Sequence, residues 1–245
     1  MKAMIFAAGL GTRLMPYTET MPKALVPVAG TPMIEILIKH LISNGITDII
    51  VNVHHFANQV IAFLSRNNNF GVKIAISNET DLLLDTGGGL EKAAWFFNDH
   101  QPFLVQNVDV ICDVNYSDLL QEHNKYNAIA TLAVSQRETT RRFIFDSSMQ
   151  LCGWENSKNQ EVKMARTQSE NMKKFAFSGI HIIDPEIFGF MSQQSKFSII
   201  ETYIEMAATQ KIVGFVHNPD YWVDMGKPDE LLKAENLLTR MKNKQ

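Results

Sequence analysis

A glycine-containing turn near the N-terminus, Gly9-Leu10-Gly11-Thr12-Arg13, is the first segment that could do chemistry. It directly follows the apolar run Ala3–Ala8, which is typical of a buried strand. Such a turn lets backbone N–H groups come close to a phosphate. Arg13 ends the turn, and Lys23 follows between Pro22 and Ala24. A guanidinium and an ammonium beside oriented amides suit a polyphosphate, so these residues predict a phosphate site.

Two common phosphate-binding turns do not match this segment. The Walker sequence needs a Gly-Lys pair followed by Ser or Thr, which is absent. The dinucleotide fingerprint needs a third glycine where Leu14 stands, and the second strand ends in Val53-His54 rather than in an acid. A purely steric role for the two glycines, and a solvated surface role for Lys23, remain as the plainer alternatives.

Two aspartates are candidate ligands for Mg²⁺. Asp109 follows the apolar run Phe103–Gln106 and should lie at the carboxyl end of a strand, where open α/β sheets bind ligands. Asp224 lies between the apolar pair Trp222-Val223 and Met225-Gly226. Carboxylate oxygens suit Mg²⁺, which proteins hold by one or two carboxylates together with phosphates and water. Either aspartate alone could equally cap a turn.

Taken together, these motifs resemble a known family. The turn at residues 9–13, followed by Pro22-Lys23-Ala24-Leu25-Val26-Pro27-Val28, is similar to the signature of the nucleotidyltransferases that form sugar nucleotides. Further matches extend over nearly the whole chain: Asp85-Thr86-Gly87-Gly88-Gly89, Asn107-Val108-Asp109, Phe177-Ser178-Gly179-Ile180 and Trp222-Val223-Asp224-Met225-Gly226. The Thr-Gly-Gly-Gly, Phe-Ser-Gly-Ile and Trp-Val-Asp segments resemble the branch that uridylylates N-acetylmuramate 1-phosphate.

The resemblance implies a role for each matching residue. Arg13 and Lys23 would act on the phosphates during transfer, and Asp109 and Asp224 would hold Mg²⁺. The nucleotide would contact Ala8, Gly9, Gly11, Thr12, Asn78, Gly87, Gly88 and Asn107, and the sugar would contact Glu155 and Gly179. Glu79, beside Asn78, could read the edge of the base. Two departures stand out: Val108 replaces the usual glycine, and the usual Glu-Lys-Pro continuation is missing after Glu155.

The implied reaction joins an NTP, best matched by UTP, to a sugar 1-phosphate and releases pyrophosphate. The attacking phosphate oxygen is already anionic, so no general base is required. The sequence shows no recognisable Ser-His-Asp or Cys-His arrangement. Three alternatives stay open. The substrates could be GTP with mannose or heptose 1-phosphate, or CTP with phosphocholine. The chain could be a non-catalytic sugar-nucleotide sensor. Loss of a charged site residue would favour that alternative, but Arg13, Lys23, Asp109 and Asp224 are all present. A nicotinamide dehydrogenase is disfavoured by Leu14.

The elements that position these residues alternate between strands and helices in the first half. Apolar and β-branched runs predict strands at 3–8, 48–53, 72–77 and 102–106. Helical patterns cover 32–43, with Thr31 as the N-cap, then 56–66, and 87–97, opened by the glycines. Strands and helices alternating in this way predict a parallel βαβ sheet.

The second half is expected to be more antiparallel. Strands are predicted at 129–134, 142–145, 151–154, 175–183 and 211–217, and helices at 198–209 and 228–241. The polar segment 157–171 reads as a loop or lid. We therefore expect one Rossmann-like domain over residues 1–245, of the glycosyltransferase-A type, with a mixed, mostly parallel central sheet.

Composition narrows the partners. The formal net charge is −3, and no long Lys/Arg block stands out beyond short groups such as Arg141-Arg142 and the tail Lys242-Asn243-Lys244, so no nucleic-acid partner is expected. The sequence shows no recognisable signal peptide and no long apolar span, so no membrane partner is expected either. The two cysteines, Cys112 and Cys152, form no framework, which fits a cytoplasmic protein with buried thiols. The sequence leaves protein partners and oligomeric state open.

Overall fold

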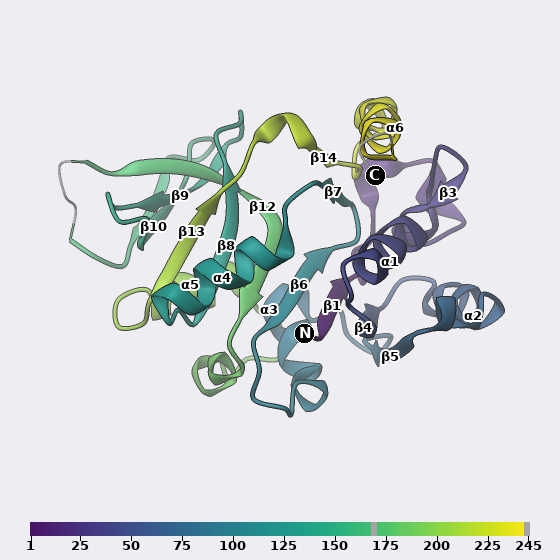
Figure 1. The fold of residues 1–245 in the computed structure, drawn as a ribbon, viewed down its shortest axis with the longest axis horizontal. Coiled ribbons are helices and arrows are strands. Elements are labelled where there is room, and N and C mark those ends of the chain that lie inside the picture. The colour runs from purple at the N-terminus through teal and green to yellow at the C-terminus, as the bar shows by residue number, and fades with distance from the viewer. Residues whose placement is uncertain (168–170, 243–245) are drawn as a thin grey trace. The chain divides into compact units, whose positions relative to one another are not determined.

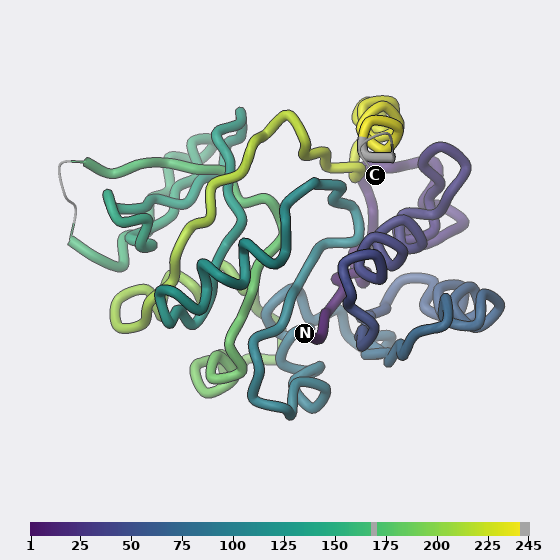
Figure 2. Tube along the Cα trace, in the orientation of Figure 1, coloured from purple at the N-terminus to yellow at the C-terminus, as the bar shows by residue number. Residues whose placement is uncertain are grey.

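The computed structural model of the chain describes residues 1–167 and 171–242. Its contacts divide the chain into two compact units, each assembled from separate stretches of sequence. Unit 1 comprises Met1–Leu84, Val105–Asp113 and Tyr221–Gln245, and unit 2 comprises Asp85–Leu104 and Val114–Asp220. The chain therefore passes from one unit to the other several times, and its path can be followed by colour in Figure 2. The expectation of one domain over residues 1–245 stays a prediction.

Unit 1 is built on a parallel sheet whose strands run in the order β6-β1-β4-β5. The strands are β1 (Ala3–Phe6), β4 (Asp48–Val53), β5 (Lys73–Asn78) and β6 (Phe103–Asn107), and the helices between them are α1 (Met33–Ser43) and α2 (Ala57–Arg66). β1 pairs with β4, and β4 with β5, in parallel register. The apolar run of β4 is buried along almost its whole length, as expected of a strand covered on both faces.

Two short ribbons and a C-terminal helix complete unit 1. The ribbons pair β2 (Pro27–Val28) with β3 (Thr31–Pro32), and β7 (Val110–Cys112) with β14 (Trp222–Asp224). Helix α6 (Pro228–Lys242) packs against β14, β2 and β7 (Figure 1). The C-terminal segment of the chain therefore closes onto the strand that follows Asp109.

Unit 2 combines antiparallel and parallel pairing. β8 (Ala130–Ser135) pairs antiparallel with β12 (Lys173–Ile183) and parallel with β13 (Ile212–Val216). β9 (Arg141–Phe145) pairs antiparallel with β12 and with β10 (Leu151–Asn156), which also pairs with β11 (Glu161–Met164). The helices are α3 (Asp85–Lys92), α4 (Tyr116–Tyr126) and α5 (Ile199–Met206). The expected α/β class with a mixed sheet is confirmed.

Short 3₁₀ turns connect many of these elements. They lie at Thr12–Leu14, Tyr17–Glu19, Lys23–Leu25, Asn68–Gly71, Ala94–Phe96, Pro185–Phe190 and Pro219–Tyr221. No helix in the ranges 1–167 and 171–242 is both long and apolar enough to cross a lipid bilayer. The end of the basic tail, residues 243–245, lies outside the described residues.

Several predicted local features are wrong. Thr31 does not cap α1, because it is paired in the β2–β3 ribbon and Pro32 occupies the N-cap position. The segment 157–171 is not simply a loop, because β11 pairs with β10 inside it; residues 168–170 lie outside the described residues. The helix at the glycines begins two residues earlier, at Asp85, whose carboxylate accepts a hydrogen bond from Thr86 N.

Two buried histidines in unit 2 make stability depend on pH. Burial lowers the pKa of His181 to about 3, and burial, partly offset by the charge of Asp184, lowers the pKa of His123 to about 4. Below pH 6.5 the unfolded chain binds protons at these positions, whereas the folded chain does not until pH approaches these lower values.

We therefore expect the free energy of unfolding to fall with pH through this window. The expected loss is about 1.4 kcal/mol per pH unit for each histidine between pH ~6.5 and pH ~4. Urea denaturation at a series of pH values measures this slope. His123→Gln should reduce the slope, whereas His100→Asn, at an exposed loop position, should not. An unchanged slope in the folded His123→Gln variant would contradict the assignment.

Candidate functional site

The glycine turn after β1 is held in shape by contacts that only glycine permits. Gly11 has φ +67°, and a Cβ there would stand 2.8 Å from Thr18 Cγ2 and 3.0 Å from Lys23 Cβ. The Thr18 hydroxyl donates to the Gly11 carbonyl at 2.9 Å. Gly9, in contrast, has open space where a side chain would point. The close approach at Gly11 brings the segment that carries Lys23 directly against the turn.

Lys23 is not a solvated surface lysine. It opens the 3₁₀ turn Lys23–Leu25 between buried Pro22 and buried Ala24, and only 13% of its side chain is exposed. Its ammonium forms an ion pair and a hydrogen bond with Asp109 Oδ2. The plainer interpretation of Lys23 is therefore wrong, and its charge is directed into the site.

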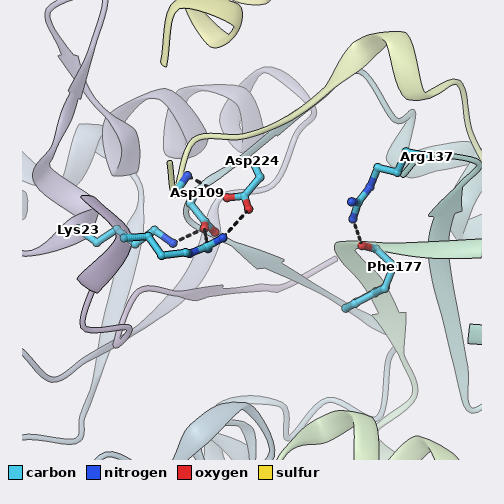
Figure 3. A network of polar contacts seen from close by, with 7 residues as sticks. Lys23, Asp109, Arg137, Phe177 and Asp224 are labelled. Carbon is cyan, nitrogen blue, oxygen red and sulfur yellow. Dashed lines mark hydrogen bonds and ion pairs between the residues drawn. The ribbon is translucent and has the colours of Figure 1, made fainter. Parts of the chain in front are cut away.

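Pairing of the β7–β14 ribbon brings the two aspartates together. Asp109 directly precedes β7, and the register places Asp224 opposite Val110. The Met225 amide donates to the Asp109 carbonyl at 2.7 Å, which fixes the end of the ribbon. Figure 3 shows both carboxylates beside Lys23. Residues more than a hundred positions apart in sequence thus share one small site.

Arg13 completes this cluster. Its Nη1 donates to Asp224 Oδ2 at 3.2 Å, and its Nη2 lies 4.0 Å from Asp109 Oδ2. Just over half of the Arg13 side chain is exposed, so the guanidinium remains accessible from solvent. The four residues predicted to act on the phosphates and the metal therefore lie together in unit 1.

The two carboxylates disturb each other's ionisation. Burial raises the pKa of Asp109, and the charge of Asp224 raises it further, while Lys23 opposes both effects. Burial also pushes the pKa of Asp224 upward, but a hydrogen bond with Asp109, the Gly226 amide and the nearby cations together lower it. Two carboxylates that repel each other in a buried place favour an added cation between them.

Gly226 leaves room for such a cation. A Cβ at this position would stand 2.7 Å from Asp224 Oδ1, 2.8 Å from Asp109 Oδ2 and 2.8 Å from Arg13 Nη2. Oxygens of both carboxylates therefore border one small space that a side chain would fill. No third His, Cys, Asp or Glu joins them among the described residues. Two carboxylates are a ligand set that suits Mg²⁺, which proteins hold by one or two carboxylates together with phosphates and water.

The other residues predicted to bind the nucleotide in unit 1 lie at the ends of strands or in the turn that follows β1. Ala8 is buried two residues after β1, and exposed Thr12 begins the next 3₁₀ turn. Asn78 and Asn107 are the last residues of β5 and β6. The Asn78 side chain accepts a hydrogen bond from Thr80 N at 2.9 Å, so it shapes the turn that follows.

Glu79 is placed differently from the expectation. It is 1% exposed, and its carboxylate oxygens accept hydrogen bonds from Asn52 and from the amide of Leu84. A buried carboxylate with these partners does not present itself to the edge of a base. The prediction that Glu79 could contact the edge of the base is therefore wrong, because its carboxylate is buried and hydrogen-bonded within the protein.

Gly87 and Gly88 lie inside α3, within unit 2. Their amides both face the Phe197 carbonyl, at 2.9 Å and 3.3 Å. A Cβ on Gly87 would overlap the ring and the backbone of Phe197. Close packing of α3 against Phe197, which lies just before α5, thus explains the glycine at position 87, whereas contact of this turn with a nucleotide stays a prediction.

The residues predicted to bind the sugar also lie in unit 2. Glu155 on β10 forms an ion pair with Lys174 at 2.7 Å. Gly179 has φ +72° within a register shift of β12. Nη2 of Arg137 donates to the Phe177 carbonyl at 2.7 Å just before this irregularity (Figure 3). The contacts of Lys174 and Arg137 were not expected from the sequence.

A comparison with known families decides the affiliation. The family model described as nucleotidyl transferase matches residues 2–241. The chain belongs to the nucleotidyl transferase family.

Relatives of the chain carry names that refer to different substrates. A UTP–glucose-1-phosphate uridylyltransferase of Synechocystis sp. is 29% identical over 253 residues, which cover 98% of the chain and 64% of the relative. A mannose-1-phosphate guanyltransferase of Yarrowia lipolytica is 30% identical, covering 96% of the chain and 63% of the relative. The chain thus spans slightly less than two thirds of the length of these relatives.

Solved structures share the fold. HddC from Yersinia pseudotuberculosis, complexed with GMP-PN, superposes with a TM-score of 0.78 at 21% identity, covering 97% of the chain and 99% of that structure. A UDP-glucose pyrophosphorylase complexed with UDP-glucose superposes with a TM-score of 0.75 at 15% identity, covering 98% of each. These similarities confirm the expected nucleotidyltransferase fold.

Two residues that the structure places at or near the site were given no role by the sequence. Gly226 lies in the matched Trp-Val-Asp-Met-Gly segment, and its position two residues after Asp224 was the available signal. Asn52 is a polar residue inside the apolar strand Asp48–Val53. A buried polar side chain needs a hydrogen-bond partner, and this requirement was the available signal.

Proposed function

We propose that the chain transfers a nucleoside monophosphate from an NTP to a sugar 1-phosphate and releases pyrophosphate. The observation that carries this proposal is one cluster of two cations and two carboxylates in unit 1: Arg13, Lys23, Asp109 and Asp224. Membership of the nucleotidyl transferase family and the names of the relatives support it. No nucleophilic side chain is needed, because both substrates bring their own reactive groups.

In the proposed reaction an anionic oxygen of the sugar phosphate attacks the α-phosphorus of the NTP. The new bond joins that oxygen to the α-phosphorus, and the bond to the oxygen bridging the α- and β-phosphorus breaks. Pyrophosphate carries away the electron pair. Lys23 and Arg13 hold the phosphates in line and offset their charge, because both cations are anchored beside the carboxylates. Amides of the glycine turn add donors for the same phosphates.

Mg²⁺ fits the pair of carboxylates, and we propose that Asp109 and Asp224 hold it at the space beside Gly226. When bound, the ion supplies Lewis-acid stabilisation of the negative charge on the phosphates. Lys23 and Arg13 balance the carboxylates on either side, so that the site can accept both the ion and an anionic substrate.

Among substrates we propose UTP and N-acetylmuramate 1-phosphate, on the resemblance of the Thr-Gly-Gly-Gly, Phe-Ser-Gly-Ile and Trp-Val-Asp segments. A second candidate keeps the chemistry and uses GTP with a mannose- or heptose-type 1-phosphate. The guanyltransferase relative of Yarrowia lipolytica and the HddC complex with GMP-PN favour that candidate.

A pyrophosphate-release assay tests the proposal by crossing the four NTPs with a panel of sugar 1-phosphates and phosphocholine. Turnover restricted to UTP with N-acetylmuramate 1-phosphate would support the first candidate. Turnover of GTP with a mannose- or heptose-type phosphate would keep the site residues and replace the substrates. Silence across the panel from folded protein would overturn the proposed activity and favour a non-catalytic sensor.

A further inference from the structure

A buried carboxylate lies next to the site without belonging to the cluster at Gly226. Glu79 follows β5 and is only 1% exposed. Its Oε1 accepts from Asn52 Nδ2 at 2.7 Å, and its Oε2 accepts from the Leu84 amide at 3.2 Å. Burying a charged carboxylate is costly unless such hydrogen bonds compensate it. Its place is therefore determined by these partners rather than by solvent.

The hydrogen-bond chain continues to the glycine turn. Asn52 lies in β4, the strand between β1 and β5, and is 3% exposed. Its Oδ1 accepts from the Ala7 amide at 2.7 Å. Ala7 directly follows β1 and stands two residues before Gly9. One buried side chain thus connects Glu79 with the backbone from which the phosphate-binding turn starts.

Backbone contacts fix the other side of Glu79. Its amide donates to the Val53 carbonyl at 2.8 Å, and its carbonyl accepts from the Leu82 amide at 3.1 Å. Nδ1 of His54 lies 2.6 Å from the same carbonyl. The turn 79–84 is therefore held by both the side chain and the backbone of one residue.

We propose that Asn52 and Glu79 are positioning residues that set the spacing between the turn 79–84 and the glycine turn 9–13. This inference rests on the proposed function, in which the glycine turn binds the phosphates, and on the expectation that Asn78 at the end of β5 contacts the same nucleotide. An NTP bridges two such segments, so its affinity depends on their separation. Neither residue touches the reacting atoms, and each acts through the backbone that it holds.

The direction of the hydrogen bonds supplies a sharp test. The Ala7 amide and the Asn52 amide group both donate, and the Glu79 carboxylate only accepts. In Glu79→Gln, one amide group must face another donor, whichever way either side chain is turned. In Asn52→Asp, two carboxylates face each other in a buried place. Each single variant therefore breaks the chain of hydrogen bonds.

The double variant Asn52→Asp/Glu79→Gln restores it with the polarity reversed. Asp at position 52 accepts from the Ala7 amide and from the new Gln amide group, and the Gln carbonyl accepts from the Leu84 amide. Ser77→Ala is the matched control, because Ser77 is buried in β5, two residues before Glu79, and its hydroxyl has no hydrogen-bond partner among the described residues.

The experiment is a calorimetric titration of each folded variant with Mg·UTP and Mg·GTP, without a sugar phosphate. We expect each single variant to lose about tenfold or more in affinity, and the double variant to recover most of that loss. Ser77→Ala should bind as the wild type does. Folded single variants with wild-type affinity would overturn the inference, as would a folded double variant without recovery.

The wild-type titration separates this inference from the proposed function. If the wild type binds neither nucleotide, the proposed function fails and takes the inference with it. If the wild type binds and the variants bind equally well, only the inference fails. Should the single variants not fold, the folded double variant decides: affinity near that of the wild type supports the inference, and a lost affinity overturns it.

Discussion

Replacing Asp109 with asparagine is expected to lower the rate of pyrophosphate release by about a thousandfold, or about 4 kcal/mol of transition-state stabilisation. Asn keeps the shape of the side chain and removes the negative charge at the place where Lys23 and the proposed metal site meet. The Asn side-chain oxygen can still accept a hydrogen bond from Lys23, and circular dichroism checks that the variant is folded.

The matched control is Asp48→Asn. Asp48 forms an exposed ion pair with Lys73 at 3.6 Å, and exposed pairs contribute little to stability. Pyrophosphate release from this control should match the wild type within error. Near-normal release from folded Asp109→Asn would contradict the role given to Asp109, whatever substrates the chain uses.

Gly226→Ala is the second substitution with a large expected effect. The new Cβ would enter the space bordered by Asp109 Oδ2, Asp224 Oδ1 and Arg13 Nη2. Gly226 shows no positive φ, so alanine strains no backbone there, and the damage should be confined to the site. We expect about a hundredfold loss of turnover with a much smaller change in thermal stability.

Gly189→Ala controls for the added methyl group, because the same construction at Gly189 meets nothing within 4 Å. Raising the Mg²⁺ concentration should recover part of the activity of Gly226→Ala, since the methyl group competes with the ion for space. Full activity in Gly226→Ala at ordinary Mg²⁺ concentrations would mean that the ion is held elsewhere.

The sequence predicts the charged cluster well for a physical reason. Arg13 and Lys23 belong to one short segment, and Asp109 follows an apolar strand whose end can be recognised locally. The role of Gly226 could not be derived in that way. It depends on the pairing of β7 with β14, and these strands belong to distant stretches of the chain.

Other differences follow from burial and weak periodicity. Glu79 directly follows β5, where a charged residue is expected to face solvent, and its hydrogen bonds with Asn52 and the Leu84 amide explain how it is buried. Helix α4 was missed because the segment Tyr116–Tyr126 is mostly polar. Its one local signal is Asn115, whose side chain caps the amides of Ser117 and Asp118.

The most direct test of the central claim is pyrophosphate release from UTP and N-acetylmuramate 1-phosphate as Mg²⁺ is titrated. The proposed site predicts release that rises with Mg²⁺, stops on chelation and yields one UDP-sugar for each pyrophosphate. Arg13→Met and Lys23→Met should each weaken this release, because both cations are anchored at the carboxylates. Release that is unaffected by chelation, or none from folded protein with any NTP and sugar phosphate, would contradict the account.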